Sequence, residues 1–186
     1  MSSSFFSVII LAIAFILIEI TYFFIKRKEN KKRTKRYESA INSFETLSQN
    51  HKEYLFDLAD RTSVFYLSFV LNNVIFLTCG LFGLIFSVAT LVLSETSLCS
   101  QYSCTPFETF VLSFLAIIFV IVVLYVKPQG HCREYLLAWR KMNAHTQKLL
   151  QKDFNRLSKK KVDKLIEKSV KFRSKIERSL NSDEGN

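Results

Sequence analysis

Few residues of this chain combine a reactive type with a spacing that could support chemistry. Arg140 and His145 are separated by four residues in a basic segment, and Glu19 is the one ionisable residue in the run Met1 to Ile25. The chain has no Gly-rich phosphate loop, no Cys-x-x-Cys pair and no His-Glu-x-x-His helix. Its four glycines are too few to build the loops that usually carry catalytic groups. We therefore expect no enzyme, no cofactor and no metal site.

The run Arg140-Lys-Met-Asn-Ala-His145 has Arg-x4-His spacing and in this respect resembles the HEPN ribonuclease family. The resemblance implies that Arg140 and His145 would act together on RNA without a metal, with both side chains facing a cleft between two copies. The alternative is that both residues belong to a solvated helix. Ribonuclease activity is thus a secondary hypothesis for this chain.

The elements that carry these residues follow from three apolar blocks. Apolar residues make up 49% of the 186 residues, yet the net charge is +10, so apolar and basic residues must be segregated. Phe5 to Ile25, Thr62 to Ser94 and Thr109 to Val126 are apolar runs that are almost free of charge. About 20 such residues cross the roughly 30 Å of a bilayer core as a helix. The sequence predicts an all-α, multi-pass transmembrane protein with three membrane-spanning helices.

The positive charge predicts how these spans are oriented. Eight basic residues lie between Lys26 and Arg36, and residues 127–186 carry 16 basic against seven acidic side chains. Basic segments remain on the cytoplasmic side of a membrane. We expect an inner-membrane protein whose N-terminus and short loop 94–108 are outside and whose C-terminus is cytoplasmic. The basic cluster follows the first span, which favours a retained anchor over a cleaved signal peptide.

Four segments result: an anchor at 1–25, a basic linker and amphipathic helix at 26–63, a transmembrane hairpin at 64–126, and a basic helical tail at 127–186. Apolar residues from Tyr37 to Leu58 recur at steps of three and four, as in a coiled coil. No Gly or Pro lies between Tyr37 and Cys79, which predicts one rod that enters the second span. Two further amphipathic helices are expected, at about 133–157 and in a basic stretch at 162–180.

Two features of the hairpin concern packing. The second apolar run is longer than the third, so the segment Val64 to Leu71 is expected to lie in water and to need a protein partner. Residues Tyr22 to Phe24 or a second copy of the chain could supply that cover. Cys79, Gly83 and Ser87 form a stripe of small residues that allows close helix packing. The stripe packs either within its own hairpin, our first choice, or between copies.

Polar residues in or near the spans have alternative roles. Glu19 lies seven residues from Lys26, so it either reaches the basic cluster or has a functional role inside the membrane. Cys99 and Cys104 both fall in the outside loop, where an oxidising compartment would permit a disulfide. The alternative is two free loop thiols.

The basic cytoplasmic surface has three classes of partner: anionic lipid headgroups, which we favour, an acidic protein, or nucleic acid. The order of cytosolic helix, transmembrane hairpin and cytosolic helices over Tyr37 to Leu180 resembles the SLATT-type membrane effectors of prokaryotic defence systems. The membrane accessory of type VI CRISPR loci is similar in pairing an anchor with an Arg-x4-His element. The resemblance implies a homo-oligomeric membrane effector or pore-forming accessory. The alternative is a tether or immunity-type protein that recruits a cytosolic or membrane partner.

Overall fold

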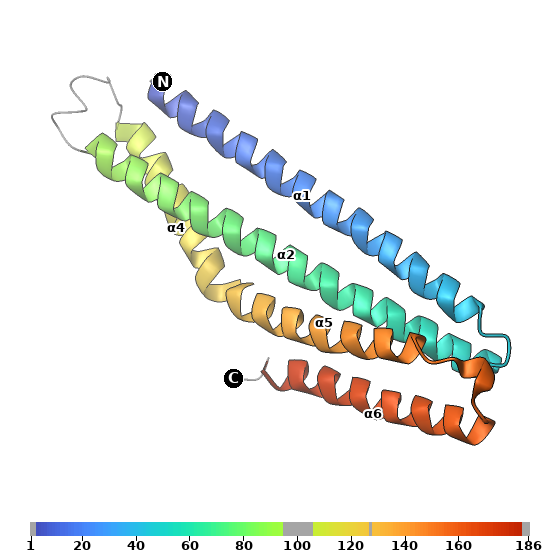
Figure 1. Ribbon diagram of the computed structural model, residues 1–186. Helices are drawn as coiled ribbons and strands as arrows, with labels where there is room; N and C mark the ends of the chain where they lie inside the picture. The colour runs from blue at the N-terminus through green and yellow to red at the C-terminus, as the bar shows by residue number, and fades with distance from the viewer. Residues whose placement is uncertain (1–2, 95–105, 127, 184–186) are drawn as a thin grey trace. The chain divides into compact units, whose positions relative to one another are not determined.

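The chain folds into helices in every part that the structure describes. The computed structural model describes residues 3–94, 106–126 and 128–183 (Figure 1). Its elements are α1 (Ser3–Asn42), α2 (Gln49–Ser94), α4 (Pro106–Val126), α5 (Pro128–Leu150), the 3-10 helix η1 (Phe154–Arg156) and α6 (Lys159–Asp183). No strand occurs within these ranges, so the expected all-α class is confirmed. Prolines begin α4 and α5, where a missing backbone N–H costs no helical hydrogen bond.

The helices divide between two compact units. Unit 1 comprises Met1–Phe24 and Leu71–Gly130, and unit 2 comprises Ile25–Val70 and His131–Asn186. Both α1 and α2 therefore contribute one part of their length to each unit. Helix α4 ends at Val126, which is also the last residue of the third apolar run.

Unit 1 has a small aromatic core. Phe82 and Leu112 are fully buried, and the ring of Phe82 meets those of Phe15 and Phe119 at centroid distances of 5.6 and 5.3 Å. Ala12 and Ala116 complete the close contacts of α1, α2 and α4. This core leaves most other apolar side chains of the unit on its surface.

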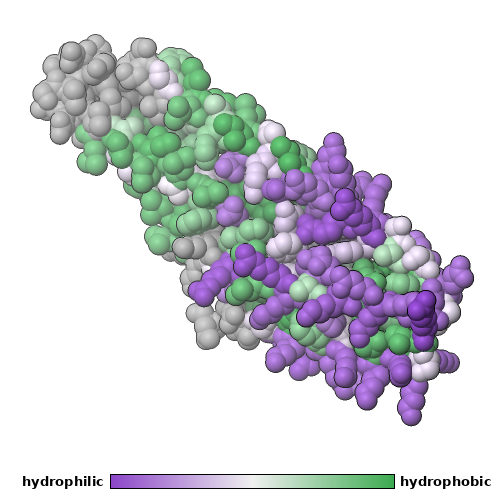
Figure 2. Space-filling model, viewed as in Figure 1, coloured by the Kyte–Doolittle hydropathy of each residue, from purple (hydrophilic) through white to green (hydrophobic). Residues whose placement is uncertain are grey.

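Two helices of the described chain are long and apolar enough to cross a membrane. In the most apolar 18-residue window, only 6% of α1 and 22% of α2 is buried, whereas a core helix of a soluble protein is mostly buried. Figure 2 shows the contrast on one face, with hydrophobic colour over unit 1 and hydrophilic colour over unit 2. The third apolar helix is shorter, with an apolar stretch at Thr109–Leu124.

Unit 2 packs α1, α2, α5 and α6 around a continuous core. Its most buried side chains include Ile41, Leu58, Met142 and Phe154, each less than 1% exposed. Apolar residues of α6 close the core on a further side, namely Val162, Ile166 and Ile176. The amphipathic spacing of these segments therefore corresponds to a buried face, as it does in soluble helical bundles.

The expected single rod from Tyr37 to Cys79 is wrong, because α1 ends at Asn42 and α2 begins only at Gln49. The intervening turn is held by contacts with the link between α5 and α6. The Phe44 ring packs edge-on against Phe154 at 5.0 Å, and the Thr46 hydroxyl lies 3.1 Å from Asn155 Oδ1. These contacts stabilise a break that contains neither Gly nor Pro.

The segment Val64 to Leu71 is covered in part within the described chain, whereas Val64 and Leu71 themselves are 43% and 47% exposed. Phe65 and Tyr66 are buried, the former against Tyr135 and the latter against Trp139 at a centroid distance of 5.1 Å. Helix α5 thus provides the cover that the sequence analysis sought from Tyr22 to Phe24 or from a second copy. This cover comes from the amphipathic helix expected at about 133–157, which was not considered as a partner for the segment.

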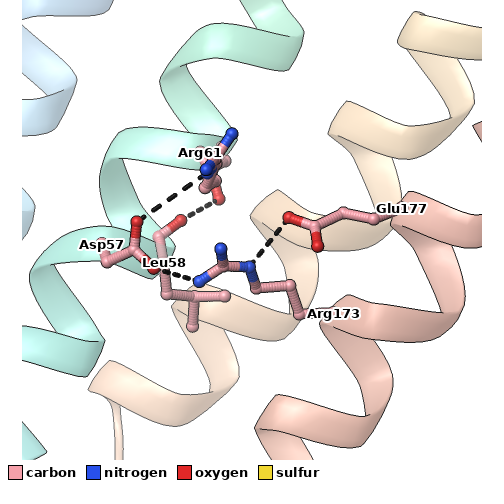
Figure 3. A network of polar contacts seen from close by, with 6 residues as sticks. Asp57, Leu58, Arg61, Arg173 and Glu177 are labelled. Atoms are coloured by element: carbon pink, nitrogen blue, oxygen red, sulfur yellow. Dashed lines mark hydrogen bonds and ion pairs between the residues drawn. The ribbon is translucent and has the colours of Figure 1, made fainter.

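A charged network joins α2 to α6 at the surface of unit 2 (Figure 3). Arg173 forms ion pairs with Asp57 of α2 and, at 2.8 Å, with Glu177 of its own helix. Burial disfavours the Arg173 charge, but the hydrogen bonds to Glu177 and Asp57 outweigh it and raise the pKa of Arg173. Behind the network, the buried hydroxyls of Thr62 and Thr146 lie 3.4 Å apart, and Thr62 donates to Leu58 O. These polar contacts align the helices without interrupting the apolar core.

The core of unit 2 yields a matched stability test. Leu58→Ala should lower the free energy of unfolding by about 2–5 kcal/mol, because it opens a cavity at a fully buried site. Leu137→Ala, at a site 44% exposed, should cost no more than about 0.5 kcal/mol. Chemical denaturation of the detergent-solubilised protein, followed by circular dichroism, measures both changes. Equal losses in the two variants would contradict the described packing.

Candidate functional site

An apolar groove lies between α2 and α4 in unit 1. It has a volume of about 350 Å³, and its walls include Leu84, Val88, Leu91 and Val123. The predicted small residues Cys79, Gly83 and Ser87 all line it. Their short side chains leave room in the groove, which allows a second helix to approach closely.

Gly83 places the stripe in contact with its own hairpin. A Cβ atom at Gly83 would lie 3.7 Å from Phe119 Cβ and from Val120 Cγ2 of α4, at ordinary contact distance. Ser87 is exposed and donates to Gly83 O at 2.6 Å within the helix, so its hydroxyl is satisfied internally. One edge of the stripe, at Gly83, thus packs on α4, while Ser87 is exposed.

Glu19 lies half-buried in unit 1 without a polar partner. Its Oε2 atom is buried, and no hydrogen bond or ion pair of Glu19 occurs among the described residues. Thr78 Oγ1 is likewise buried without a hydrogen bond. Since α1 and α2 run antiparallel and Phe15 meets Phe82, a step of four residues along each helix brings Glu19 and Thr78 to the same level. The pairing of Glu19 with the basic cluster is not observed, because Lys26 bonds Glu29 at 2.9 Å.

A buried polar cluster in unit 2 was not anticipated from the sequence. Asn30 is 2% exposed and donates through Nδ2 to Ser63 Oγ at 2.5 Å and to Ser63 O at 3.2 Å. Arg33 donates to Asn30 Oδ1 at 3.1 Å, and its guanidinium lies over the rings of Tyr66 and Trp139 at 4.4 and 5.2 Å. A cation held over aromatic rings is stabilised by their electron-rich faces. The signal available in the sequence was a lone Asn within a charged run.

Arg140 and His145 occupy different surroundings on α5. A step of five positions along the helix places their side chains about 140° apart around the axis. Arg140 is exposed, with no hydrogen bond or ion pair among the described residues. His145 faces α6, where Nε2 lies 2.8 Å from Ser169 Oγ and the ring stacks on Phe172 at 4.4 Å. The two side chains therefore do not meet within one copy of the chain.

The His145 environment favours the neutral imidazole. Burial is the main cause that lowers the pKa of His145 below its ordinary value of 6.5, and the nearby Lys148 charge lowers it further. Ser169, itself fully buried, accepts or donates at Nε2 according to the histidine tautomer. An uncharged ring stacked on Phe172 fits a role in packing α5 on α6.

The remaining candidates form no cluster. No group of three or more His, Cys, Asp or Glu side chains within the described ranges is placed to hold a metal ion. Neither Cys79 nor Cys132 forms a disulfide. Cys99 and Cys104 lie outside the described residues, so their disulfide stays a prediction.

The His145 site predicts a pH dependence of stability. Because folding lowers the pKa of His145, its contribution is complete above about pH 6.5 and is lost as the pH falls towards the folded value. An NMR titration of 13C-labelled histidine in detergent should give a midpoint below 6.5 for His145. Phe172→Ala should move that midpoint upwards by exposing the ring, whereas Leu137→Ala should not. A parent midpoint at or above 6.5 would contradict the described burial.

Comparison with known proteins supplies no family for this chain. No family model, curated protein or solved structure matches it. The residues and surfaces described above are therefore the only basis for assigning a function.

Proposed function

We propose that this chain is an integral membrane protein that acts by self-association, as an oligomeric membrane effector or pore-forming accessory. The observation that carries the proposal is the apolar exterior of unit 1. Its most exposed large side chains come from all three helices and include Ile10, Ile18, Leu84, Leu91, Phe107 and Phe110, each more than 60% exposed. Water solvates such a surface poorly, whereas hydrocarbon accepts it.

In this proposal α4 is the third span. Its 21 residues measure about 32 Å at 1.5 Å per residue, which suffices for a hydrocarbon core of roughly 30 Å. Glu108 is its single charged residue and lies in the first turn. The chain then crosses the inner membrane three times, with the basic residues 26–36 and 127–186 in the cytoplasm.

Self-association is proposed to use the groove between α2 and α4. Transmembrane helices gain little from burying apolar groups against each other, so close van der Waals contact over small residues is a main source of attraction. The open edge at Ser87 and the neighbouring Gly80, which has free space beside its Cα, allow a second copy to approach. The architectural resemblance to SLATT-type defence effectors agrees with this assembly.

A tether is the second candidate function, favoured by the basic surface of unit 2. Lysine and arginine side chains near an anionic leaflet contribute about 1 kcal/mol each to attraction. A tether would hold unit 2 and its partners at the membrane without opening a pore. The two candidates differ in whether the bilayer remains sealed.

The three-span topology predicts where each terminus lies. A C-terminal alkaline phosphatase fusion should be inactive and a C-terminal fluorescent protein bright, because the tail remains in the cytoplasm. A single cysteine introduced as Ser7→Cys in a cysteine-free background should react with an impermeant maleimide on spheroplasts. An active C-terminal phosphatase would contradict the topology.

Pore formation predicts dye release from liposomes. The parent protein should release trapped carboxyfluorescein, and Ser87→Leu should reduce the rate at least tenfold because the added side chain fills the groove. Ala14→Leu adds similar bulk at an exposed position of α1 away from the groove and should leave the rate unchanged. Cross-linking should show fewer oligomers for Ser87→Leu alone.

Each outcome of the leakage assay has a separate meaning. A sealed liposome with the parent protein would contradict pore formation and favour the tether. Release by Ser87→Leu at the parent rate would place the interface elsewhere. Circular dichroism of the variants checks that the helical content is retained.

A further inference from the structure

A cationic groove lies between the η1 link and α6 in unit 2. Its volume is about 610 Å³, and five of its lining residues are basic: Lys152, Arg156, Lys161, Lys164 and Lys168. Asp153 is the one acidic residue in the lining. A concave surface with this excess of positive charge attracts anions more strongly than scattered surface lysines do.

Most of this charge is not neutralised within the chain. Asp153 pairs with Arg156 at 2.9 Å, which leaves the four lysines. None of these lysines makes a side-chain hydrogen bond or ion pair with another described residue. Elsewhere on α6, by contrast, Lys171 pairs with Glu167 and Arg173 pairs with Glu177. The four lysines of the groove thus form no ion pair within the described residues, although Lys171 and, to a lesser extent, Lys164 are close enough to Glu167 to lower the pKa of that carboxyl.

The groove also offers apolar contact. Leu157 and Leu165 line it, and both are only partly buried against the core of unit 2. No aromatic side chain lines it, so a nucleobase would find no ring on which to stack. Lysines beside exposed leucines suit a ligand that carries carboxylates next to apolar side chains.

Within unit 2, the groove lies at the end away from the residues where the chain passes into unit 1. Chain crossings into unit 1 occur next to residues 25, 70 and 131, which lie together at one end of unit 2. The α5–α6 link, which forms the groove, lies at the other end with the α1–α2 turn, as the Thr46 and Asn155 contact shows. Residues 131 to 150 of α5 separate these ends by roughly 29 Å.

From these four observations we propose that the groove binds an acidic amphipathic helix of a cytoplasmic protein. Lys161, Lys164 and Lys168 follow one side of α6 over roughly 10 Å, or about two helical turns. Glutamates or aspartates of the partner would lie over these lysines while its leucines contact Leu157 and Leu165. Helix-in-groove recognition of this type reads apolar anchors at steps of three and four residues.

This inference does not depend on pore formation. The groove belongs to unit 2 alone, and peptide binding and dye release are measured separately. A partner helix that docks here would be the signal to which an effector responds or the cargo that a tether holds. Failure of either proposal would therefore leave the other open to test.

The test uses the full chain in an uncharged detergent and a fluorescein-labelled 12-residue helix of glutamates with leucines on one face. Fluorescence anisotropy should report saturable binding that weakens as salt rises, since exposed charges are screened. The double variant Lys164→Glu with Lys168→Glu should raise the Kd at least tenfold. A matched control, Lys175→Glu with Arg178→Glu, makes the same charge change on α6 outside the groove and should alter the Kd less than twofold.

Three results would overturn the proposal. If both double variants lost the same affinity for the peptide, binding would depend on net charge rather than on the groove. Equal affinity for a peptide of the same composition with its leucines scattered would remove the role of Leu157 and Leu165. Tighter, groove-dependent binding of a 12-nucleotide oligothymidylate or of phosphatidylglycerol vesicles would identify nucleic acid or lipid as the occupant.

Discussion

The surface of unit 1 sets the main constraint on this molecule, because apolar side chains cover its exterior as well as its interior. Only a small core at Phe82 and Leu112 is enclosed by α1, α2 and α4. Water around so many exposed Leu, Ile and Phe side chains would be costly at about 25 cal/mol for each square ångström. A bilayer removes that cost. The proposed membrane location would also explain both the lengths of the apolar helices and the confinement of most basic residues to unit 2.

Unit 2 meets the opposite requirement, since it must be stable with charged groups in water. Its solution is a helical bundle with an apolar core and a few polar contacts that link helices. Asn30 with Ser63 and Arg33 with Trp139 join α1, α2 and α5, and Arg173 with Asp57 joins α6 to α2. Such contacts add modestly to stability but restrict which helix faces can meet.

Local patterns were sufficient to predict much of the fold but little of the site. Apolar runs predicted helices and the end of the third run at Val126, because this signal acts within a few residues. The turn after Asn42 could not be predicted in this way, since Phe44 and Thr46 depend on residues more than 100 positions later. The same limit hid Asn30 and Arg33, whose partners lie on other helices. Gly83 and Glu19 stood out because small or charged residues are conspicuous within an apolar run.

The core of unit 2 joins two stretches of chain that are far apart in synthesis. Leu55 and Leu58 leave the ribosome well before Met142, Phe154 and Ile166, against whose cluster they pack. Until the residues from Met142 onwards emerge, the apolar face of α2 at Leu55 and Leu58 has no partner from that part of the chain. The rest of α2 and all of α4 have been synthesised by then. The core of unit 2 can therefore fold only after the last third of the chain has been translated. During that interval, a chaperone or a second nascent chain can bind the exposed apolar face that contains Leu55 and Leu58.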